Sequence, residues 1–568
     1  MMNGSHDVEK PVDKVLSKEV DSTLAHATVS MEAARPPPSV AEDDMDPSLP
    51  PPVPLRPITT THSTRSQRAA AHTIDNFEMA PENPRNWSKQ KKWRLTLVIA
   101  ITAFVTTSAS SMVVPGIDDA MKEYGESNHK VGVLISTTFV LGMGAGPFLF
   151  APISELYGRQ VAYHTSQACY VPLSIGAALA PNMATLLVLR FLCGICGSVG
   201  TTLGIATVAD VFSPAERGLP VSTYTLGPML SPVIATMVGY WVLYGGWRWL
   251  LWTPVILAAF NWFLLLIATE ETYAPIIIKR LQYEVTHPQE EPPGWRDKLS
   301  PRRLIHNLAW MSAMVSRDQA RQTFGRAFSR PPRLLFTNPV CALFALYYGY
   351  LYACIYIFLV TIPLLYTHQT QYPNLFSYEW PQYTAGLAYV GLGIGYLIAS
   401  VTGSTQQDKI YRRLSARNKD NGQPEYRLLL TQVGVIILPI GCFVFGWTAH
   451  FQAHWIAPQV GECLVAWGLM VAFNSLQTFL IDAFYPYSAA ATAAAIGLRS
   501  AMACVLPVFT PEMFGRLGWG WGGTVLAFVA LSALPAPLIV GLCQFANVLI
   551  SQMFKYGRRL RERFQFEG

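Results

Sequence analysis

The chain has 568 residues, of which 51% are hydrophobic and only 14% are charged. Because a soluble domain carries about 25% charged residues, this composition excludes a string of soluble domains. The 9 cysteines all fall inside apolar stretches, so the sequence indicates no extracellular disulfide framework.

The first 86 residues read as a tail. They contain the proline clusters RPPPSV and PSLPPPVPLRP, and no apolar run appears before Leu95. A signal peptide needs such a run, and a folded core needs more apolar surface than this segment offers. We therefore expect residues 1–86 to form a disordered cytosolic tail.

Twelve apolar stretches of about 20 residues follow, each long enough to cross a hydrocarbon core of about 30 Å. They lie at about 94–114, 131–152, 161–180, 184–208, 219–242, 248–268, 339–362, 383–403, 428–448, 455–481, 489–510 and 522–548. The sequence thus predicts an all-α membrane protein with two pseudo-symmetric six-helix bundles, residues 87–268 and 338–550. A basic cytosolic linker, 269–337, joins them, and a basic cytosolic tail, 551–568, follows.

The positive charges set the predicted orientation. They gather before the first span, in the linker, after the eighth span and in the C-terminal KYGRRLRER; between Lys279 and Arg333 the linker has 11 Lys/Arg against 5 Asp/Glu. If twelve spans alternate, these segments share one side of the membrane. Positively charged loops favour the cytosolic side, so both termini are expected there.

An internal repeat relates the two halves. ADVFSP follows the fourth span and IDAFYP follows the tenth, so that Asp210 matches Asp482. Twenty residues earlier, the same offset matches Arg190 with Glu462. Repeat-built bundles are how secondary transporters place a site at the interface of two halves.

Arg190 and Glu462 are the predicted proton-coupling residues. An arginine inside an apolar span costs roughly 2.5–3.5 kcal/mol and by default marks a polar cavity. If the span begins at residue 184, Arg190 lies about 9 Å along the helix at a rise of 1.5 Å per residue. The alternative is that its side chain snorkels to the membrane interface. A titratable acid at the matching depth could exchange a proton against a solute, but local structural pairing of Glu462 also fits.

The turn APISELYGRQ predicts a gate at one end of the bundle. Gly158 permits the turn, and Glu155 and Arg159 stand four residues apart around it. These charges would clamp neighbouring helix ends and release them when the bundle rocks. The alternative is an ordinary surface pair worth under about 1 kcal/mol.

In this order, NPRNWS, SELYGRQ, LRFLCG, DVFSPAERG, LGPMLSP and PEYRL resemble the major facilitator superfamily, and within it the fungal twelve-span drug:proton antiporter branch, over about residues 83–556. The resemblance implies a cytosolic gate at Glu155, Gly158, Arg159, Asp210, Glu216 and Arg217. It also implies proton coupling at Arg190 and a fifth-span antiporter motif at Gly227, Pro228, Ser231 and Pro232. The fourth and tenth spans, which carry Arg190 and Glu462, would line a central cavity from opposite halves. Ser231 departs from the family glycine, and simple proline kinking is the alternative for this span.

Candidate substrate-cavity residues are polar or aromatic: Thr106, Tyr348, Tyr352, Asn474 and Gln477. Core packing and interhelical hydrogen bonding explain such side chains equally well. We interpret Arg499, a second intramembrane cation, as structural. Two buried arginines and no acid near the middle of the first six spans favour neutral, amphipathic or acid-bearing solutes.

The sequence therefore predicts a monomeric exporter in the plasma membrane, driven by proton antiport and alternating access, for a drug, secondary metabolite or organic acid. The expected partners are this small molecule, protons and the lipid bilayer, with no nucleic acid. No Walker motif, metal-ligand cluster or nucleophile with a base is present, so we expect no cofactor, no metal and no enzyme activity. A proton-coupled uptake carrier or facilitator, or a transport-inactive membrane sensor, are the alternatives.

Overall fold

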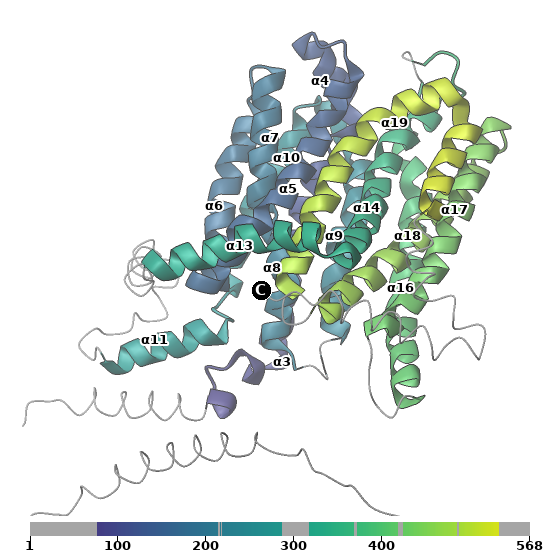
Figure 1. The fold of residues 1–568 in the computed structure, drawn as a ribbon. Helices are drawn as coiled ribbons and strands as arrows, with labels where there is room; N and C mark the ends of the chain where they lie inside the picture. The colour runs from purple at the N-terminus through teal and green to yellow at the C-terminus, as the bar shows by residue number, and fades with distance from the viewer. Residues whose placement is uncertain are drawn as a thin grey trace, which may run out of the picture. The chain divides into compact units, whose positions relative to one another are not determined.

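The structure, a computed structural model, describes residues 77–213, 216, 218–286, 317–368, 372–417, 424–484 and 488–532. All regular elements in these ranges are helical (Figure 1). They belong to one compact unit, Thr61–Gly568. The tail before residue 77 and the C-terminal tail 551–568 lie outside the described residues.

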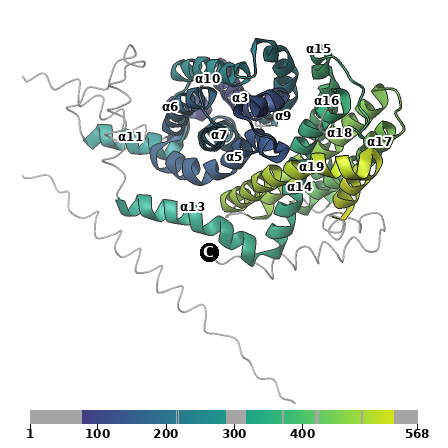
Figure 2. The same ribbon diagram turned by 90° about the horizontal axis from the view of Figure 1, so that it is seen from above.

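The first group of helices, here called the N-terminal set, precedes the linker. It consists of α3 (Lys89–Ser111), α4 (Ile117–Tyr124), α5 (His129–Tyr157), α6 (Arg159–Ala178), α7 (Met183–Gly197), α8 (Val199–Val211), α9 (Gly218–Val242) and α10 (Trp249–Ala268), with the short η4 (Val114–Gly116) and η5 (Leu243–Gly245). Seen from above, α3, α5, α6, α7, α9 and α10 form one cluster (Figure 2).

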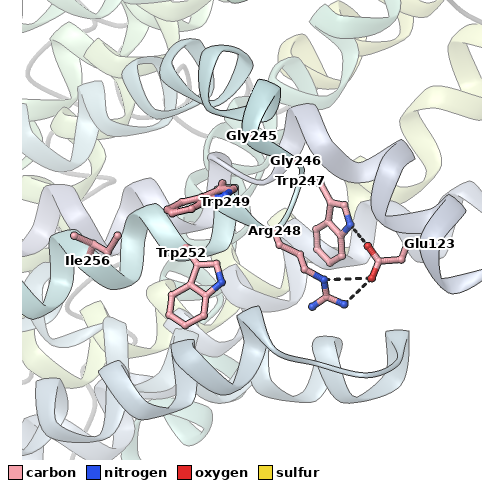
Figure 3. A pocket seen from close by; sticks show the side chains of 8 residues that line it. All are labelled: Glu123, Gly245, Gly246, Trp247, Arg248, Trp249, Trp252 and Ile256. Carbon is pink, nitrogen blue, oxygen red and sulfur yellow. Dashed lines mark hydrogen bonds and ion pairs between the residues drawn. The ribbon is translucent and has the colours of Figure 1, made fainter.

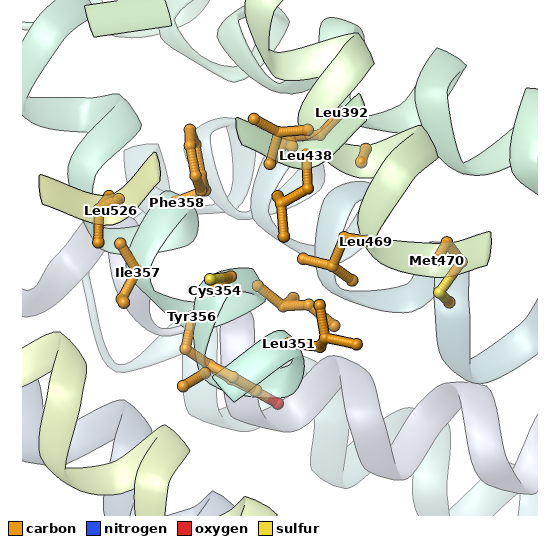
Figure 4. Packing of buried hydrophobic residues seen from close by; sticks show 14 of the residues in the cluster. Leu351, Cys354, Tyr356, Ile357, Phe358, Leu392, Leu438, Leu469, Met470 and Leu526 are labelled. Atoms are coloured by element: carbon orange, nitrogen blue, oxygen red, sulfur yellow. The ribbon is translucent and has the colours of Figure 1, made fainter. Parts of the chain in front are cut away.

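The second group, the C-terminal set, follows the linker. It consists of α14 (Pro339–Tyr366), α15 (Gln382–Ala385), η7 (Gly386–Tyr389), α16 (Val390–Arg417), η8 (Pro424–Arg427), α17 (Leu428–His450), α18 (Ile456–Ala483) and α19 (Ser488–Ser532). Its core is built around α14, whose Leu351, Cys354 and Phe358 pack with Leu392, Leu438, Leu469 and Leu526 from the other helices (Figure 4).

Two segments outside these sets are also helical. The linker contains α11 (Ala274–Thr286) and α13 (Arg317–Thr337). Residues 77–86 differ from the predicted disordered tail, because they fold into η2 (Phe77–Met79) and η3 (Pro84–Asn86). The Asn83 amide donates to the Phe77 carbonyl at 3.1 Å, and Lys92 Nζ on α3 donates to the Arg85 carbonyl at 2.6 Å.

All twelve predicted spans coincide with helix in their described parts, but only 10 described helices are long and apolar enough to cross a membrane. The third span, α6, is missing from these because it carries buried polar side chains, among them His164 and Gln167. The last two spans share α19, whose backbone breaks at Gly518 with φ +75°. Residues 533–548 lie outside the described range, so the count of twelve and the cytosolic termini stay predictions.

The two sets contact each other through α5 and α19. Phe148 lies against Gly497, Thr137 Oγ1 lies 3.7 Å from the thiol of Cys504, and Lys130 Nζ lies 2.7 Å from Glu512 Oε2. These pairs follow α5 from Lys130, near its start, to Phe148. We name the two ends of the helix bundle after residues at the two ends of α5, the Lys130 end and the Gly158 end.

Candidate functional site

Arg190 lies on α7 and is only 3% exposed. Its Nε donates to the Ile135 carbonyl on α5 at 2.8 Å, while Nη1 and Nη2 donate to the carbonyls of Ala109 and Ser110 on α3 at 2.8 and 3.4 Å. Its guanidinium carbon lies 4.8 Å from the ring centre of Phe139. The protein encloses this cation, so the geometry favours the buried position over the snorkelling alternative.

The space beside Arg190 is small. A cavity of about 10 Å³ is lined by Ala109, Phe139, Tyr170, Ser174, Ala177, Arg190, Cys193, Leu251 and Pro254. Such a volume is about that of one water-sized probe. All of these residues belong to the N-terminal set, so Arg190 faces a one-water space within that set rather than a wide cavity shared by both.

Ser110 joins the surroundings of Arg190 to the C-terminal set. Its carbonyl accepts from Arg190 and also from Ser136 Oγ at 2.6 Å. Its hydroxyl lies 3.1 Å from the Tyr356 hydroxyl on α14. A continuous series of hydrogen bonds therefore runs from α7 through α3 to α14.

Glu462 lies on α18 with 0% exposure. Neither of its carboxyl oxygens has a hydrogen-bond partner among the described residues. A methyl group at Gly391 on α16 would lie 3.1 Å from Oε2, so the side chain packs between α18 and α16. The contacts of the described residues do not join Glu462 to Arg190; each of the two side chains packs within its own set.

The tyrosines predicted to line a substrate cavity surround Arg499. The Arg499 Nη1 donates to the Tyr348 hydroxyl at 2.8 Å, and its guanidinium carbon lies 4.5 Å from the ring centre of Tyr352. Tyr348 also stacks on Phe473 of α18 with ring centres 4.3 Å apart. Tyr348 is buried, whereas Tyr352 is half-buried. The predicted aromatic face of α14 thus meets a cation from α19.

The other cavity candidates separate into two places. Asn474 and Gln477 are half-buried on α18, close along the helix to Phe473. Thr106 is buried inside the N-terminal set, where its hydroxyl donates to the Thr102 carbonyl at 2.9 Å. The hydroxyl of Thr106 therefore serves its own helix.

At the Gly158 end, Arg159 pairs with Asp210 rather than with Glu155. The Nε of Arg159 lies 3.2 Å from Asp210 Oδ2, and its Nη1 donates to Ser154 Oγ at 2.8 Å. Glu155 and Glu216 are exposed. Arg217, the last of the predicted gate residues, lies outside the described residues.

The same kind of ion pair recurs in the C-terminal set. The Nε of Arg427, at the start of α17, donates to Oδ2 of Asp482 near the end of α18, and the guanidinium lies 4.7 Å from the Tyr411 ring centre. Asp482 is the residue that the repeat matches with Asp210. The sequence analysis missed Arg427. The available signal was its position in PEYRL at the start of α17, which resembles the position of Arg159 in YGRQ at the start of α6. Each set therefore carries one Arg–Asp clamp at a corresponding place in its fold.

Glu271, which the sequence analysis also missed, holds the start of α6. Its carboxylate accepts from the backbone N–H groups of Arg159, Gln160, Thr272 and Tyr273 at 2.9, 3.2, 3.0 and 2.9 Å. Burial raises the pKa of the Glu271 carboxyl, and these N–H donors act in the opposite direction. A carboxylate at a helix N-terminus also interacts favourably with the helix dipole. This residue therefore ties the α5–α6 turn to the segment after α10.

Replacing Gly158 by alanine is expected to weaken this turn. Gly158 has φ +95°, and a methyl group there would overlap the Glu271 carboxylate. We expect a loss of about 2–3 kcal/mol in stability and a lower melting temperature of the purified protein. Gly246→Ala is the matched control, since Gly246 has φ +102° but no atom within 4 Å of the added methyl group. Equal losses in both variants would contradict the Glu271 contact.

The fifth-span motif packs α9 against α3. A methyl group at Gly227 would lie 2.8 Å from the Ala100 carbonyl oxygen. Ser231 Oγ donates to the Phe104 carbonyl at 2.8 Å and lies 2.8 Å from Ser108 Oγ. Pro228 and Pro232 both lie inside the helix. The serine that departs from the family glycine thus adds a polar contact between these two helices.

The Lys130–Glu512 ion pair joins the two sets at the Lys130 end, with 45% and 33% of the side chains exposed. We expect Lys130→Glu to slow transport by up to about fivefold, because it places two acids where the sets meet and exposed pairs are worth at most about 1 kcal/mol. The double variant Lys130→Glu/Glu512→Lys should recover most of the rate in a vesicle flux assay. Failure of the second change to restore the rate would argue against a gating contact.

A surface pocket of about 660 Å³ lies near the α4 and α10 termini (Figure 3). It is lined by Glu123, Gly245, Gly246, Trp247, Arg248, Trp249, Trp252 and Ile256. Arg248 Nη2 donates to Glu123 Oε1 at 2.7 Å, and the indole N–H of Trp247 donates to the other carboxylate oxygen. None of the predicted transport residues lines this pocket.

Residues 99–511 match the family model described as Major Facilitator Superfamily. The chain belongs to the Major Facilitator Superfamily. It is therefore a multi-pass membrane protein of a transporter family.

Fungal relatives are similar along most of the chain. The MFS transporter cpaT of Aspergillus oryzae is 33% identical over 488 residues, covering 86% of this chain and 91% of cpaT. The efflux pump radE of Floropilus chiversii is 31% identical over 489 residues, covering 86% of this chain and 84% of radE. The solved proton:xylose symporter XylE shares the fold with a TM-score of 0.56 and 14% identity, covering 80% of this chain and 96% of XylE.

Proposed function

We propose that this protein exports a small organic molecule, a drug, secondary metabolite or organic acid, across the plasma membrane in exchange for protons. The observation that carries the proposal is the pair of ionisable side chains, Arg190 and Glu462, buried at repeat-related depths in a superfamily transporter. A buried ionisable group in a membrane span is costly and marks an ion or proton pathway by default. The similarity to radE supports outward transport.

Glu462 is the proton carrier in this proposal. Its neutral form needs no charged partner, which suits a carboxyl group whose oxygens are buried without hydrogen-bond partners among the described residues. When the C-terminal set moves and water reaches α18, the water solvates the charged carboxylate of Glu462. The proton then leaves. Loading and release of one proton thus accompany the two positions of the set.

Contacts at opposite ends of the bundle support alternating access in this proposal. The Arg159–Asp210 and Arg427–Asp482 clamps each hold one set together at the Gly158 end. The Lys130–Glu512 pair joins the sets at the other end. In the proposal, each set stays rigid at its clamp, while the Lys130–Glu512 contact breaks and reforms as the sets rock.

Flux in everted vesicles tests the proposal. The transported compound is first identified by comparing culture medium from cells with and without the gene. In everted vesicles that carry the full-length protein, an acidic lumen should drive accumulation of this compound, and an alkaline lumen should not. Loss of the compound from an acidic lumen would indicate uptake by symport, and movement independent of pH would indicate a facilitator. No flux, with a phenotype lost on deletion of residues 1–86, would indicate a sensor.

A further inference from the structure

Arg499 is a half-buried cation whose guanidinium has unused hydrogen-bonding capacity. Its Nη1 donates to Tyr348, but its Nε is buried without a hydrogen-bond partner, and the ion pairs of the described residues do not include it. A guanidinium carries five N–H donors. Leaving a buried charged group incompletely paired is costly unless a ligand completes it.

Arg190 provides the contrast within the same protein. All three of its nitrogen atoms donate to main-chain carbonyls of its own set. Three of its five N–H donors are therefore already used by the protein. Of the two intramembrane arginines, Arg499 therefore has more N–H donors left for an anion.

Aromatic rings surround Arg499 from two helices. The guanidinium carbon lies 4.5, 5.5 and 5.7 Å from the ring centres of Tyr352, Tyr348 and Phe473. The Tyr352 and Phe473 rings stack with centres 6.0 Å apart. Ring faces attract a guanidinium and reduce the cost of holding it out of water. The same rings offer flat apolar surface for an aromatic ligand.

This cluster lies where the two sets meet. Tyr356, one turn from Tyr352, contacts Ser110 of the N-terminal set. Ser500, beside Arg499, lies so close to α5 that a methyl group at Gly144 would overlap it. An alternating-access carrier holds its substrate between its two halves. The cluster is thus in the part of the molecule that a transported molecule would cross.

We propose that Arg499, with Tyr352 and Phe473, binds the carboxylate of an aromatic organic acid, an inference that rests on the proposed export function and names its substrate class. The guanidinium offers its free N–H donors to the carboxylate oxygens, and such charge-assisted bonds are strong and directional. The ring of the acid lies against the aromatic side chains. The bulk of the ligand is apolar, as suits passage between membrane helices.

Equilibrium dialysis on the purified full-length protein in lipid nanodiscs tests this site, with 2-naphthoate and the uncharged 2-naphthamide as probes. We expect the wild-type protein to bind the acid at least about tenfold more tightly, since a hydrogen bond to a charged group is worth about 1.5–3 kcal/mol. Arg499→Gln should reduce the affinity for the acid to that for the amide and leave the amide unchanged. Arg499→Lys should keep part of the preference, and Tyr352→Leu should weaken both probes.

Unchanged amide binding by Arg499→Gln shows that the variant is folded, and Arg413→Gln, at an exposed arginine of α16, should retain the preference for the acid. Equal binding of both probes by the wild-type protein, no binding of either, or a preference that survives in Arg499→Gln would overturn the proposal. Dialysis needs no gradient. If the protein prefers the acid but drives no outward flux, export is refuted and the binding site is retained. If it exports the compound but shows no preference for the acid, the binding site is refuted and export is retained.

Discussion

Glu462→Gln is expected to remove proton-driven accumulation while leaving substrate exchange intact. Glutamine has the shape of the protonated carboxyl group but cannot release a proton. A gradient of one pH unit stores about 1.4 kcal/mol per proton, which sustains about a tenfold concentration ratio in one-for-one exchange. In everted vesicles this ratio should fall to about one in the variant, whereas exchange of labelled for unlabelled substrate should stay within about twofold of the wild-type rate.

The matched control is Glu126→Gln, in the segment between α4 and α5, where the side chain is half-buried and accepts a local bond from the Asn128 N–H at 2.9 Å. This variant should keep both activities. If Glu462→Gln still accumulates substrate against its gradient, the carboxyl group is structural and a different residue carries the proton. Loss of exchange together with accumulation would likewise point to a structural role.

Arg190→Lys is expected to reduce transport by at least about tenfold even though the positive charge remains. The guanidinium reaches carbonyls on α3 and α5 at the same time. A single ammonium group cannot satisfy both helices with the same geometry, and a hydrogen bond to a charged group is worth about 1.5–3 kcal/mol. Initial rates in vesicles, corrected for the amount of protein inserted, measure this loss.

Arg190→Ala should have a larger effect on stability. Removal of the side chain would enlarge the neighbouring 10 Å³ cavity and leave the Ile135 and Ala109 carbonyls without this donor. We expect a cost of about 3 kcal/mol, read as a lower melting temperature of the purified protein. Arg413→Ala, at an exposed arginine, should have little effect. A normal melting temperature for Arg190→Ala would contradict the hydrogen-bonding role assigned here.

The apolar runs made the helices predictable, because a segment of about 20 apolar residues has few stable alternatives to a helix in a membrane. The burial of Arg190 followed for the same reason, since a guanidinium inside a span requires polar partners. The sequence shows the polar residues His164 and Gln167 in the third span, but not that they are buried in α6. The kink at Gly518 divides α19 into two helices between the last two predicted spans, in agreement with the sequence.

The relation between Arg190 and Glu462 shows what a repeat can predict. An offset between repeats fixes the depth of a residue along its helix at 1.5 Å per residue. It does not fix the direction of the side chain around the helix, which packing decides. Arg190 therefore turned out to contact α3 and α5, and Glu462 to pack against Gly391 of α16. The expectation of a cation and an acid facing each other came from this depth and from the resemblance to the superfamily, neither of which fixes the packing of a side chain.

Glu271 was missed because its contacts are distant in sequence. It follows α10, more than 100 residues after the α6 N-terminus that it caps, at a separation of 112 from Arg159. The signal available was an acidic pair, Glu270 and Glu271, directly after an apolar span. Only the fold brings that pair beside the Gly158 turn, where free N–H groups at a helix start favour a carboxylate.

Proton movement that accompanies transport is the most direct test of the central claim. Purified protein is reconstituted into liposomes that enclose a pH-sensitive dye, without an imposed gradient, and the exported compound is added outside. Antiport predicts that protons leave the lumen as the compound enters, so that the lumen becomes alkaline, and that Glu462→Gln abolishes the signal. Acidification of the lumen, or entry of the compound without any pH change, would contradict the account.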